Sequence, residues 1–277
     1  MFDNLTGLNS RVRLNNGVQM PVLGLGVWQM NDGEEVKKVV KTAIEQGYRL
    51  IDTAKVYRNE AGVGEAVKEC GVPREELFIT TKVWNTDQGY DNTLRAFDES
   101  MSRLQLEYLD LYLIHWPGKD KFKETWRAME KLYAEGRIKA IGVSNFLIHH
   151  LEELIDSSEV VPTVNQVEYH PLLTQPELKA YCERHKIQLE AWSPLMRGQL
   201  DLPVLTQLAD KYGKTPAQIV LRWDLQNGVV TIPKSVRYER IVENSQVFDF
   251  ELSEDDMEAI NSLNQNKRFG GHPDEFF

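Results

Sequence analysis

Residues 47–60 read GYRLIDTAKVYRNE, in which a short apolar, strand-like run ends at Asp52 and Tyr57 follows five residues later. The pattern returns twice, because FITTKVW carries Lys82 and LYLIHWP carries His115, each toward the carboxyl end of another apolar run. A carboxylate, a phenol, an ammonium and an imidazole therefore follow three successive predicted strands. A hydrophobic core has no need of these groups at one edge, so the pattern predicts a reactive site as well as a fold.

Outward from this stretch, strand-like and helix-like segments alternate along the chain. Such alternation implies parallel strands joined by right-handed crossovers. Eight strand candidates in 277 residues favour an α/β fold made of a single (β/α)8 TIM barrel, one domain over 1–277, rather than an open sheet. The predicted strands are 22–27, 49–52, 77–83, 109–115, 138–143, 164–168, 188–192 and 229–233, and the predicted helices are 34–46, 61–69, 92–104, 122–135, 149–155, 175–185 and a double helix over 204–226.

A β-hairpin is predicted before the barrel. VRL at 12–14 leads into a turn through Asn15, Asn16 and Gly17, and VQMPVLGLG follows. Asn-Gly tolerates the positive φ values that tight hairpin turns require.

Composition and charge narrow the class of protein. With 42 acids against 32 Lys and Arg, the net charge of -10 argues against nucleic acid as a partner. Cys70 and Cys182 have no metal-binding or CxxC spacing, and the segment after Met1 is polar, without a signal sequence. No stretch approaches the roughly 20 apolar residues of a membrane span. We therefore expect a cytoplasmic protein that acts on a small molecule. We also expect it to be a monomer, although composition and charge do not determine the oligomeric state.

Further polar residues lie where the predicted strands end, at the face where barrel enzymes place their active sites. Taken singly, each has an ordinary explanation, since a strand-end Ser or Asp often caps a helix and a Lys is usually solvated. Their occurrence on successive strands favours a site instead. These residues are Ser144, Asn145, Gln166, Ser193, Lys234 and Ser235.

The first four residues suggest proton transfer. A phenol with a pKa of about 10 is a poor donor at neutral pH, but a nearby cation such as Lys82 lowers that pKa. Asp52 can hold the ammonium, and His115 can orient a carbonyl oxygen. General acid catalysis of this kind contributes on the order of 10²- to 10⁴-fold, but no side chain donates hydride, so a nicotinamide cofactor is implied.

Several motifs together resemble those of the aldo-keto reductases, NADPH-dependent carbonyl reductases built on a (β/α)8 barrel. The resemblance implies Tyr57 as the proton donor, Lys82 and Asp52 as the pair that lowers its pKa, and His115 as the group that orients the substrate. A histidine rather than a glutamate at that position speaks against steroid double-bond reduction. The chain is most similar to short microbial and protozoan members, the group of 2,5-diketo-gluconate reductase, glyoxal reductase and prostaglandin F synthase. The motifs are GYRLIDTAKVYRNE, FITTKVWN, LDLYLIHWP, IGVSNF, VNQVEYHP, AWSPL and IPKSVRYERIVEN.

The same resemblance places an NADPH site. Trp192 would stack on the nicotinamide, although a strand-end aromatic is more often core. Ser193 and Leu195 of the SPL segment would also bind the cofactor. Its carboxamide would be held by Ser144, Asn145 and Gln166. In IPKSVRYERIVEN, Arg240 and Glu243 could be a solvated helix pair. The resemblance instead implies a pocket for the 2'-phosphate and adenine, formed by Lys234, Ser235, Arg240, Glu243 and Asn244.

The resemblance also implies which residues line the substrate pocket, and the sequence departs from the family pattern at one position. The lining comprises Trp28, Val56, Trp84, Asn85, His115 and Trp116, and a short tail over 267–277 leaves a fairly open pocket. Met196 stands where the family continues with glycine, so the family does not predict the shape of the cofactor-covering loop at Met196 and Arg197.

Two other kinds of site are not expected. Gly24 and Gly26, like Gly62 and Gly64, lack the third glycine of a Rossmann fingerprint. The remaining histidines lack metal-ligand spacing, so we predict no metal; they are His149, His150, His170, His185 and His272.

The main hypothesis is thus a reductase of aldehydes or ketones, with two alternatives. The same site could work mainly as an alcohol dehydrogenase, because it stabilises one transition state in both directions. A nucleotide-binding regulatory subunit with negligible turnover would have no need of Tyr57 and Lys82 together.

Overall fold

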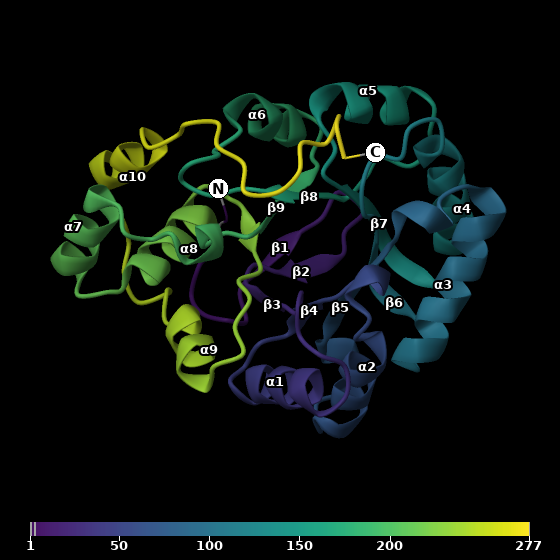
Figure 1. Cartoon of the computed structure of the whole chain (residues 1–277), viewed down its shortest axis with the longest axis horizontal. Coiled ribbons are helices and arrows are strands. Elements are labelled where there is room, and N and C mark those ends of the chain that lie inside the picture. The colour runs from purple at the N-terminus through teal and green to yellow at the C-terminus, as the bar shows by residue number, and fades with distance from the viewer. Residues whose placement is uncertain (1, 3, 277) are drawn as a thin grey trace.

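Eight parallel strands form a barrel at the centre of the molecule, and helices surround it (Figure 1). In the computed structural model, which describes residue 2 and residues 4–276, the strands pair in chain order from β3 to β10. Parallel bridges from Leu23 to Thr231 and from Gly26 to Lys234 join the last strand to the first. The strands are β3 (Gly24–Gly26), β4 (Leu50–Asp52), β5 (Phe78–Val83), β6 (Leu109–Ile114), β7 (Ile138–Ser144), β8 (Val164–Glu168), β9 (Gln188–Trp192) and β10 (Val230–Thr231).

The helices confirm the predicted alternation, with ends that differ by one or two residues. The region after β10 differs: the helix start expected there is a full helix, α9, and α10 was not predicted. In α10 only Asp256 and Ile260 are buried, so its apolar face is too narrow to give a periodic signal. The helices are α1 (Glu34–Glu45), α2 (Glu60–Glu69), α3 (Tyr90–Leu104), α4 (Phe122–Ala134), α5 (Ile148–Asp156), α6 (Pro176–Arg184), α7 (Pro203–Tyr212), α8 (Pro216–Gln226), α9 (Tyr238–Ser245) and α10 (Glu254–Asn261).

Side chains along each strand alternate between the inside and the outside of the barrel. In β5, Phe78 belongs to the apolar cluster inside the barrel, whereas Ile79 and Val83 belong to the larger cluster under the helices. The predicted hairpin is confirmed as β1 (Arg11–Arg13) paired with β2 (Gln19–Pro21). Leu14, which follows β1, and Met20 of β2 belong to the inner cluster. Apolar residues thus fill one end of the interior, and the period of two directs polar strand-end residues into the other.

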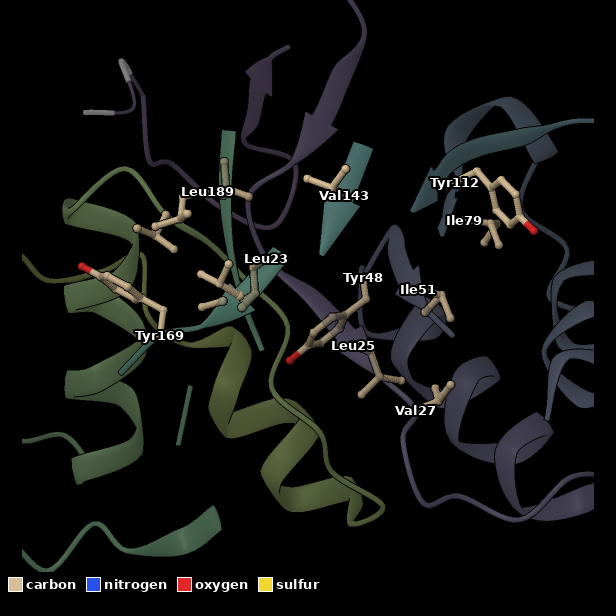
Figure 2. Packing of buried hydrophobic residues seen from close by; sticks show 14 of the residues in the cluster. Leu23, Leu25, Val27, Tyr48, Ile51, Ile79, Tyr112, Val143, Tyr169 and Leu189 are labelled. Carbon is tan, nitrogen blue, oxygen red and sulfur yellow. The ribbon is translucent and has the colours of Figure 1, made fainter. Parts of the chain in front are cut away.

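The larger core lies between the barrel and its helices. Figure 2 shows residues of this layer from several strands, including Leu25, Ile51, Ile79 and Tyr112. Tyr48, which follows α1, donates its hydroxyl proton to the Ile241 carbonyl of α9 at 2.7 Å. This bond ties α9 to the barrel wall next to α1.

Glycines in α2 serve helix packing. A Cβ atom on Gly64 would lie 2.1 Å from the Leu104 carbonyl oxygen of α3, so only glycine permits this approach of the two helices. Gly62 lies in the same helix, under Val36 of α1. Neither glycine belongs to a phosphate-binding turn, in agreement with the prediction. Within the described residues, no helix combines the length and apolar character needed to cross a membrane.

Candidate active site

The four residues of the sequence pattern meet at the carboxyl end of the barrel. Lys82 Nζ donates hydrogen bonds to Asp52 Oδ1 at 2.6 Å, to the Thr53 carbonyl at 3.0 Å and to the Tyr57 hydroxyl oxygen at 3.3 Å. Asp52 ends β4, Lys82 lies on β5, and Tyr57 ends a short 3-10 helix that begins at Lys55. The His115 ring, just after β6, meets the Tyr57 ring edge-on with centroids 5.9 Å apart. The structure therefore joins groups that lie far apart in the sequence.

The electrostatics of this cluster confirm one expectation and correct another. Burial alone would lower the pKa of the Lys82 ammonium, but Asp52 and Tyr57 outweigh it, and the pKa is raised. Lys82 is thus cationic at neutral pH. For Tyr57, burial raises the pKa more than Lys82 lowers it, and the Asp52 charge raises it further. The expectation that Asp52 and Lys82 together bring the Tyr57 pKa below its ordinary value is therefore wrong for the ligand-free site, because desolvation outweighs the ammonium.

His115 is neutral at physiological pH. Burial, aided by the Lys82 charge, lowers the pKa of its imidazole well below the ordinary value. Its Nδ1 atom is buried and has no hydrogen-bond partner among the described residues. The ring also meets Trp84 edge-on at a centroid distance of 5.0 Å. A neutral imidazole held between two aromatic rings can donate a hydrogen bond without carrying charge, which suits an orienting role.

The residues expected to hold a carboxamide form a connected network beside the cluster. Ser144 Oγ donates to the Gln166 carbonyl at 2.6 Å, and Asn145 Nδ2 donates to the His115 carbonyl at 2.9 Å. Trp192 Nε1 donates to Asn145 Oδ1 at 2.8 Å. Asn145 adopts a positive φ of 62°, a conformation that asparagine tolerates better than most residues. The network joins Ser144, Asn145 and Trp192 to one another and, through Asn145, to the backbone of His115.

Gln166 also reaches the cluster formed by Asp52, Tyr57, Lys82 and His115. Its Nε2 atom donates to Asp52 Oδ2 at 2.7 Å and to Glu190 Oε2 at 3.0 Å. In the described part of the chain, no donor reaches the side-chain oxygen of Gln166, which leaves that oxygen available to a ligand. The sequence prediction omitted Glu190. Glu190 could have been found from the sequence, because it is an acid within the apolar run QLEAW. It lies two residues before Trp192 and hence on the same, inward face of β9.

The tail packs against Trp192 by means of a second buried acid that the prediction omitted. Glu168, at the end of β8, accepts hydrogen bonds from the amides of Phe269 and Gly270 at 2.7 and 2.8 Å, and pairs with His170 at 2.7 Å. Burial would raise the pKa of this carboxyl group, but these three bonds outweigh it and lower the pKa. A Cβ atom on Gly270 would lie 2.4 Å from the Trp192 ring, so the backbone of the tail lies directly on the indole.

The aromatic lining is more enclosed than the sequence suggested. Phe276 of the tail stacks on Trp116 with ring centroids 4.2 Å apart, and Trp116 is buried. In Figure 1 the yellow tail runs from α10 past α6 toward α5. Trp28 remains 41% exposed, with the Arg197 guanidinium 5.9 Å from its ring centroid. A cleft of about 470 Å³ has Val56 and Trp84 in its lining, but none of Asp52, Tyr57, Lys82 and His115 lines it.

The segment after Trp192 accommodates Met196 without glycine. Ser193, Met196 and Arg197 all have positive φ values near 50°, and the Met196 side chain is fully buried. Leu195 packs against the same core. The loop therefore forms a left-handed turn without the family's glycine, and the buried Met196 side chain holds this turn against the core.

A basic cluster follows β10, at the start of α9. Lys234 and Arg240 are exposed, and neither makes an ion pair with a described residue. Ser235 is buried and its hydroxyl oxygen accepts from the Arg237 amide at 3.1 Å, while Asn244 is buried on α9. The backbone of Glu243 accepts from Gln218. Two unpaired cations near a helix amino terminus provide a place for an anion.

Three potential metal ligands gather on α5 and the tail, although their spacing did not predict it. One ligand atom each of His149, His150 and Asp274 lies within 4.8 Å of the others. His150 Nδ1 accepts a hydrogen bond from the Leu147 amide at 3.0 Å, so the neutral ring carries its proton on Nε2, the nitrogen that faces Asp274. A protonated nitrogen is not a metal ligand, and the group therefore fits an anchor for the tail. The absence of a metal stays a prediction.

Several known proteins are similar to this chain in sequence and in structure. A model of the Aldo/keto reductase family matches residues 22–265. The chain is 63% identical over 271 residues to glyoxal reductase of Bacillus subtilis (strain 168), covering 98% of each chain. It is 53% identical over 270 residues to methylglyoxal reductase DkgA of Escherichia coli (strain K12), covering 96% of this chain and 97% of that protein. A crystal structure of a Gox0644 mutant in complex with NADPH has a TM-score of 0.91 at 45% identity, covering 96% of this chain and 97% of that chain.

Proposed function

The chain belongs to the aldo/keto reductase family, and on that basis we propose that it uses NADPH to reduce aldehydes or ketones to alcohols. One observation carries the proposal: the Lys82 ammonium lies 2.6 Å from Asp52 and 3.3 Å from the Tyr57 hydroxyl. A phenol paired with a fixed cation can give up a proton and be stabilised as a phenolate.

The reaction needs one proton and one hydride. When bound, the reduced nicotinamide supplies the hydride that the carbonyl carbon accepts. Tyr57 donates its hydroxyl proton to the carbonyl oxygen, so that C=O becomes CH–OH, and Lys82 stabilises the phenolate that remains. The raised pKa of Tyr57 keeps it protonated at neutral pH, which suits a proton donor. His115, kept neutral by burial, donates a hydrogen bond that orients the same oxygen.

The residues present fit the nicotinamide end of the cofactor. Gln166 offers a side-chain oxygen without a protein donor, and Ser144 and Asn145 lie beside it in the same hydrogen-bond network. A carboxamide has both donors and an acceptor, so it can complete this network. Trp192, whose ring is fixed by its bond to Asn145, provides the apolar face on which the ring can stack.

We expect the double variant Lys234→Ala, Arg240→Ala to weaken NADPH binding by about 10²- to 10⁴-fold and NADH binding by less than about threefold. Each lost charge-assisted hydrogen bond to the 2'-phosphate is worth about 1.5 to 3 kcal/mol, and NADH lacks that phosphate. Fluorescence titration of both cofactors measures the two dissociation constants.

The matched control removes two exposed cations from α1 and α2, Lys38→Ala with Lys68→Ala, and so changes the net charge equally. This control is expected to leave the ratio of NADPH to NADH affinity as it is. Equal losses for both cofactors in the Lys234, Arg240 variant would show that the 2'-phosphate lies elsewhere.

The proposed activity is tested by a panel of carbonyl compounds with NADPH consumption as the readout. Because the relatives named above are glyoxal and methylglyoxal reductases, we propose small dicarbonyls as the first substrates to try. NADPH binding without turnover across the panel would contradict a reductase and favour a regulatory subunit. Faster alcohol oxidation at physiological cofactor ratios would favour the dehydrogenase direction.

We further propose a monomer in a reducing compartment. Every residue of the cluster comes from one chain, so the site needs no second copy. Cys70 and Cys182 are free thiols, half-buried and buried respectively, which fits a cytoplasmic protein.

A further inference from the structure

Glu190 is a fully buried acid in the same layer as the catalytic cluster, without a role in the reaction described so far. Strand register places it beside Gln166, its neighbour on β8. Gln166 reaches across the barrel from β8 to Asp52 on β4, and its single amide nitrogen donates to both acids, at 2.7 Å to Asp52 and 3.0 Å to Glu190. One amide thus bridges two carboxyl groups from different walls of the barrel.

The arrangement supplies enough positive charge for one of these acids. Within the described structure, Lys82 donates hydrogen bonds to Asp52, to the Thr53 carbonyl and to Tyr57, and none to Glu190. Glu190 Oε1 is buried without a hydrogen-bond partner among the described residues. An ionised oxygen without a donor costs far more in a buried site than a neutral one, so the geometry favours the protonated acid.

The charges around Glu190 agree with this geometry. Burial first, and then the Asp52 charge, raise the pKa of Glu190 to about 8, while Gln166 and Lys82 oppose the shift only in part. At neutral pH the cluster therefore holds one carboxylate and one ammonium, which balance.

We propose that Glu190 is a positioning residue of this reductase, which holds the Gln166 amide in place for the cofactor and, by keeping its proton, preserves the charge balance around Lys82 and Tyr57. The inference rests on the proposed function, because the Gln166 oxygen matters only if a carboxamide binds there. With its nitrogen held by Asp52 and Glu190, Gln166 keeps its side-chain oxygen free to accept a hydrogen bond from that carboxamide.

Ionisation of Glu190 is expected to slow proton transfer from Tyr57. The charged and titratable groups that interact with it are Asp52 from β4, Lys82 from β5 and Tyr57 from the 3-10 helix. A negative Glu190 raises the pKa of Tyr57 and so makes it a weaker acid. Reduction should therefore slow as the pH rises through about 8, the pKa of Glu190.

The direct test is infrared spectroscopy of the ligand-free protein. A protonated carboxyl group absorbs at a different frequency from a carboxylate, so the two forms can be distinguished. The difference between wild type and Glu190→Gln is expected to show one protonated carboxyl band at neutral pH that disappears as the pH passes about 8. Asp224, another buried acid with a raised pKa, is the internal reference, and its band should remain in the variant. Absence of a Glu190 band at neutral pH would overturn the charge-balance role.

The positioning role is tested by NADPH titration of Glu190→Gln and Glu190→Leu. Glutamine keeps an oxygen for the Gln166 amide, whereas leucine removes it, so the leucine variant should bind NADPH at least about threefold more weakly than the glutamine variant. Equal dissociation constants in the two variants would overturn it. Thermal melts show whether each variant is folded, and the glutamine variant alone still decides the infrared test.

The pH profile connects the two roles to turnover. Wild type is expected to lose reduction rate by about threefold or more above pH 8, and this step should be absent in Glu190→Gln. An identical step in both proteins would contradict control by Glu190. If wild type reduces no carbonyl compound, the proposed function fails, while the infrared and NADPH titrations still decide the inference about Glu190.

Discussion

Replacing Tyr57 by phenylalanine should lower kcat for carbonyl reduction by about 10²- to 10⁴-fold, the contribution expected of a general acid. The substitution removes one oxygen atom, the one that lies 3.3 Å from Lys82, and leaves the ring that faces His115. NADPH affinity should change by less than about threefold, because the hydroxyl group contacts none of the residues proposed to bind the cofactor. Single-turnover rates and NADPH titration measure the two quantities separately.

Tyr112→Phe is the matched control for this prediction. Tyr112 is a fully buried tyrosine on β6 whose hydroxyl has no hydrogen-bond partner among the described residues, and its ring lies in the outer core (Figure 2). Its loss should therefore affect neither kcat nor NADPH affinity. If Tyr57→Phe kept more than about a tenth of the wild-type rate, another group would have to be the proton donor.

The sequence was sufficient to predict that the residues of the proposed catalytic cluster come together, because two regularities act together. Parallel strands present their carboxyl ends at one face, and the period of two along each strand points Asp52 and Lys82 to the same interior. Neither regularity requires the exact strand ends, so predicted strand ends that were wrong by one or two residues did not change the predicted position of these side chains. The hairpin likewise followed from a local turn signal at Asn16 and Gly17.

Interactions that depend on tertiary distance could not be predicted. Gln166 and Asp52 are 114 residues apart, and nothing in either motif indicates that one amide bridges Asp52 and Glu190. The stacking of Phe276 on Trp116 depends on the path of an irregular tail. The net direction of the Tyr57 pKa also needed the structure, since it depends on how far burial outweighs the neighbouring ammonium.

Replacing Lys82 by methionine should abolish most activity and also destabilise the protein by about 3 to 5 kcal/mol at neutral pH. The variant keeps the volume of the side chain but leaves Asp52, which is 1% exposed, without its cation. The pKa of Lys82 is raised in the folded protein, so its stabilising contribution is present below about pH 10.5 and is lost only above it. Lys82 should therefore add nothing to the change of wild-type stability with pH near neutrality, although its stabilising contribution is fully present there.

The variant should behave differently, because the buried Asp52 must then take up a proton to remain in the barrel. An acid whose folded pKa is raised loses stability as the pH rises above its unfolded value of about 4, so Lys82→Met should be less stable at pH 8 than at pH 5. Urea unfolding at the two pH values measures this difference.

The double variant Asp52→Asn, Lys82→Met separates stability from catalysis. It removes both buried charges, so it should recover at least half of the stability lost at pH 8 while kcat remains as low as in Lys82→Met. Strictly additive losses of stability would mean that the 2.6 Å contact contributes nothing as a pair. Recovery of activity together with stability would mean that the ammonium acts only as a structural partner of Asp52, and the stabilisation of a Tyr57 phenolate by Lys82 would have to be abandoned.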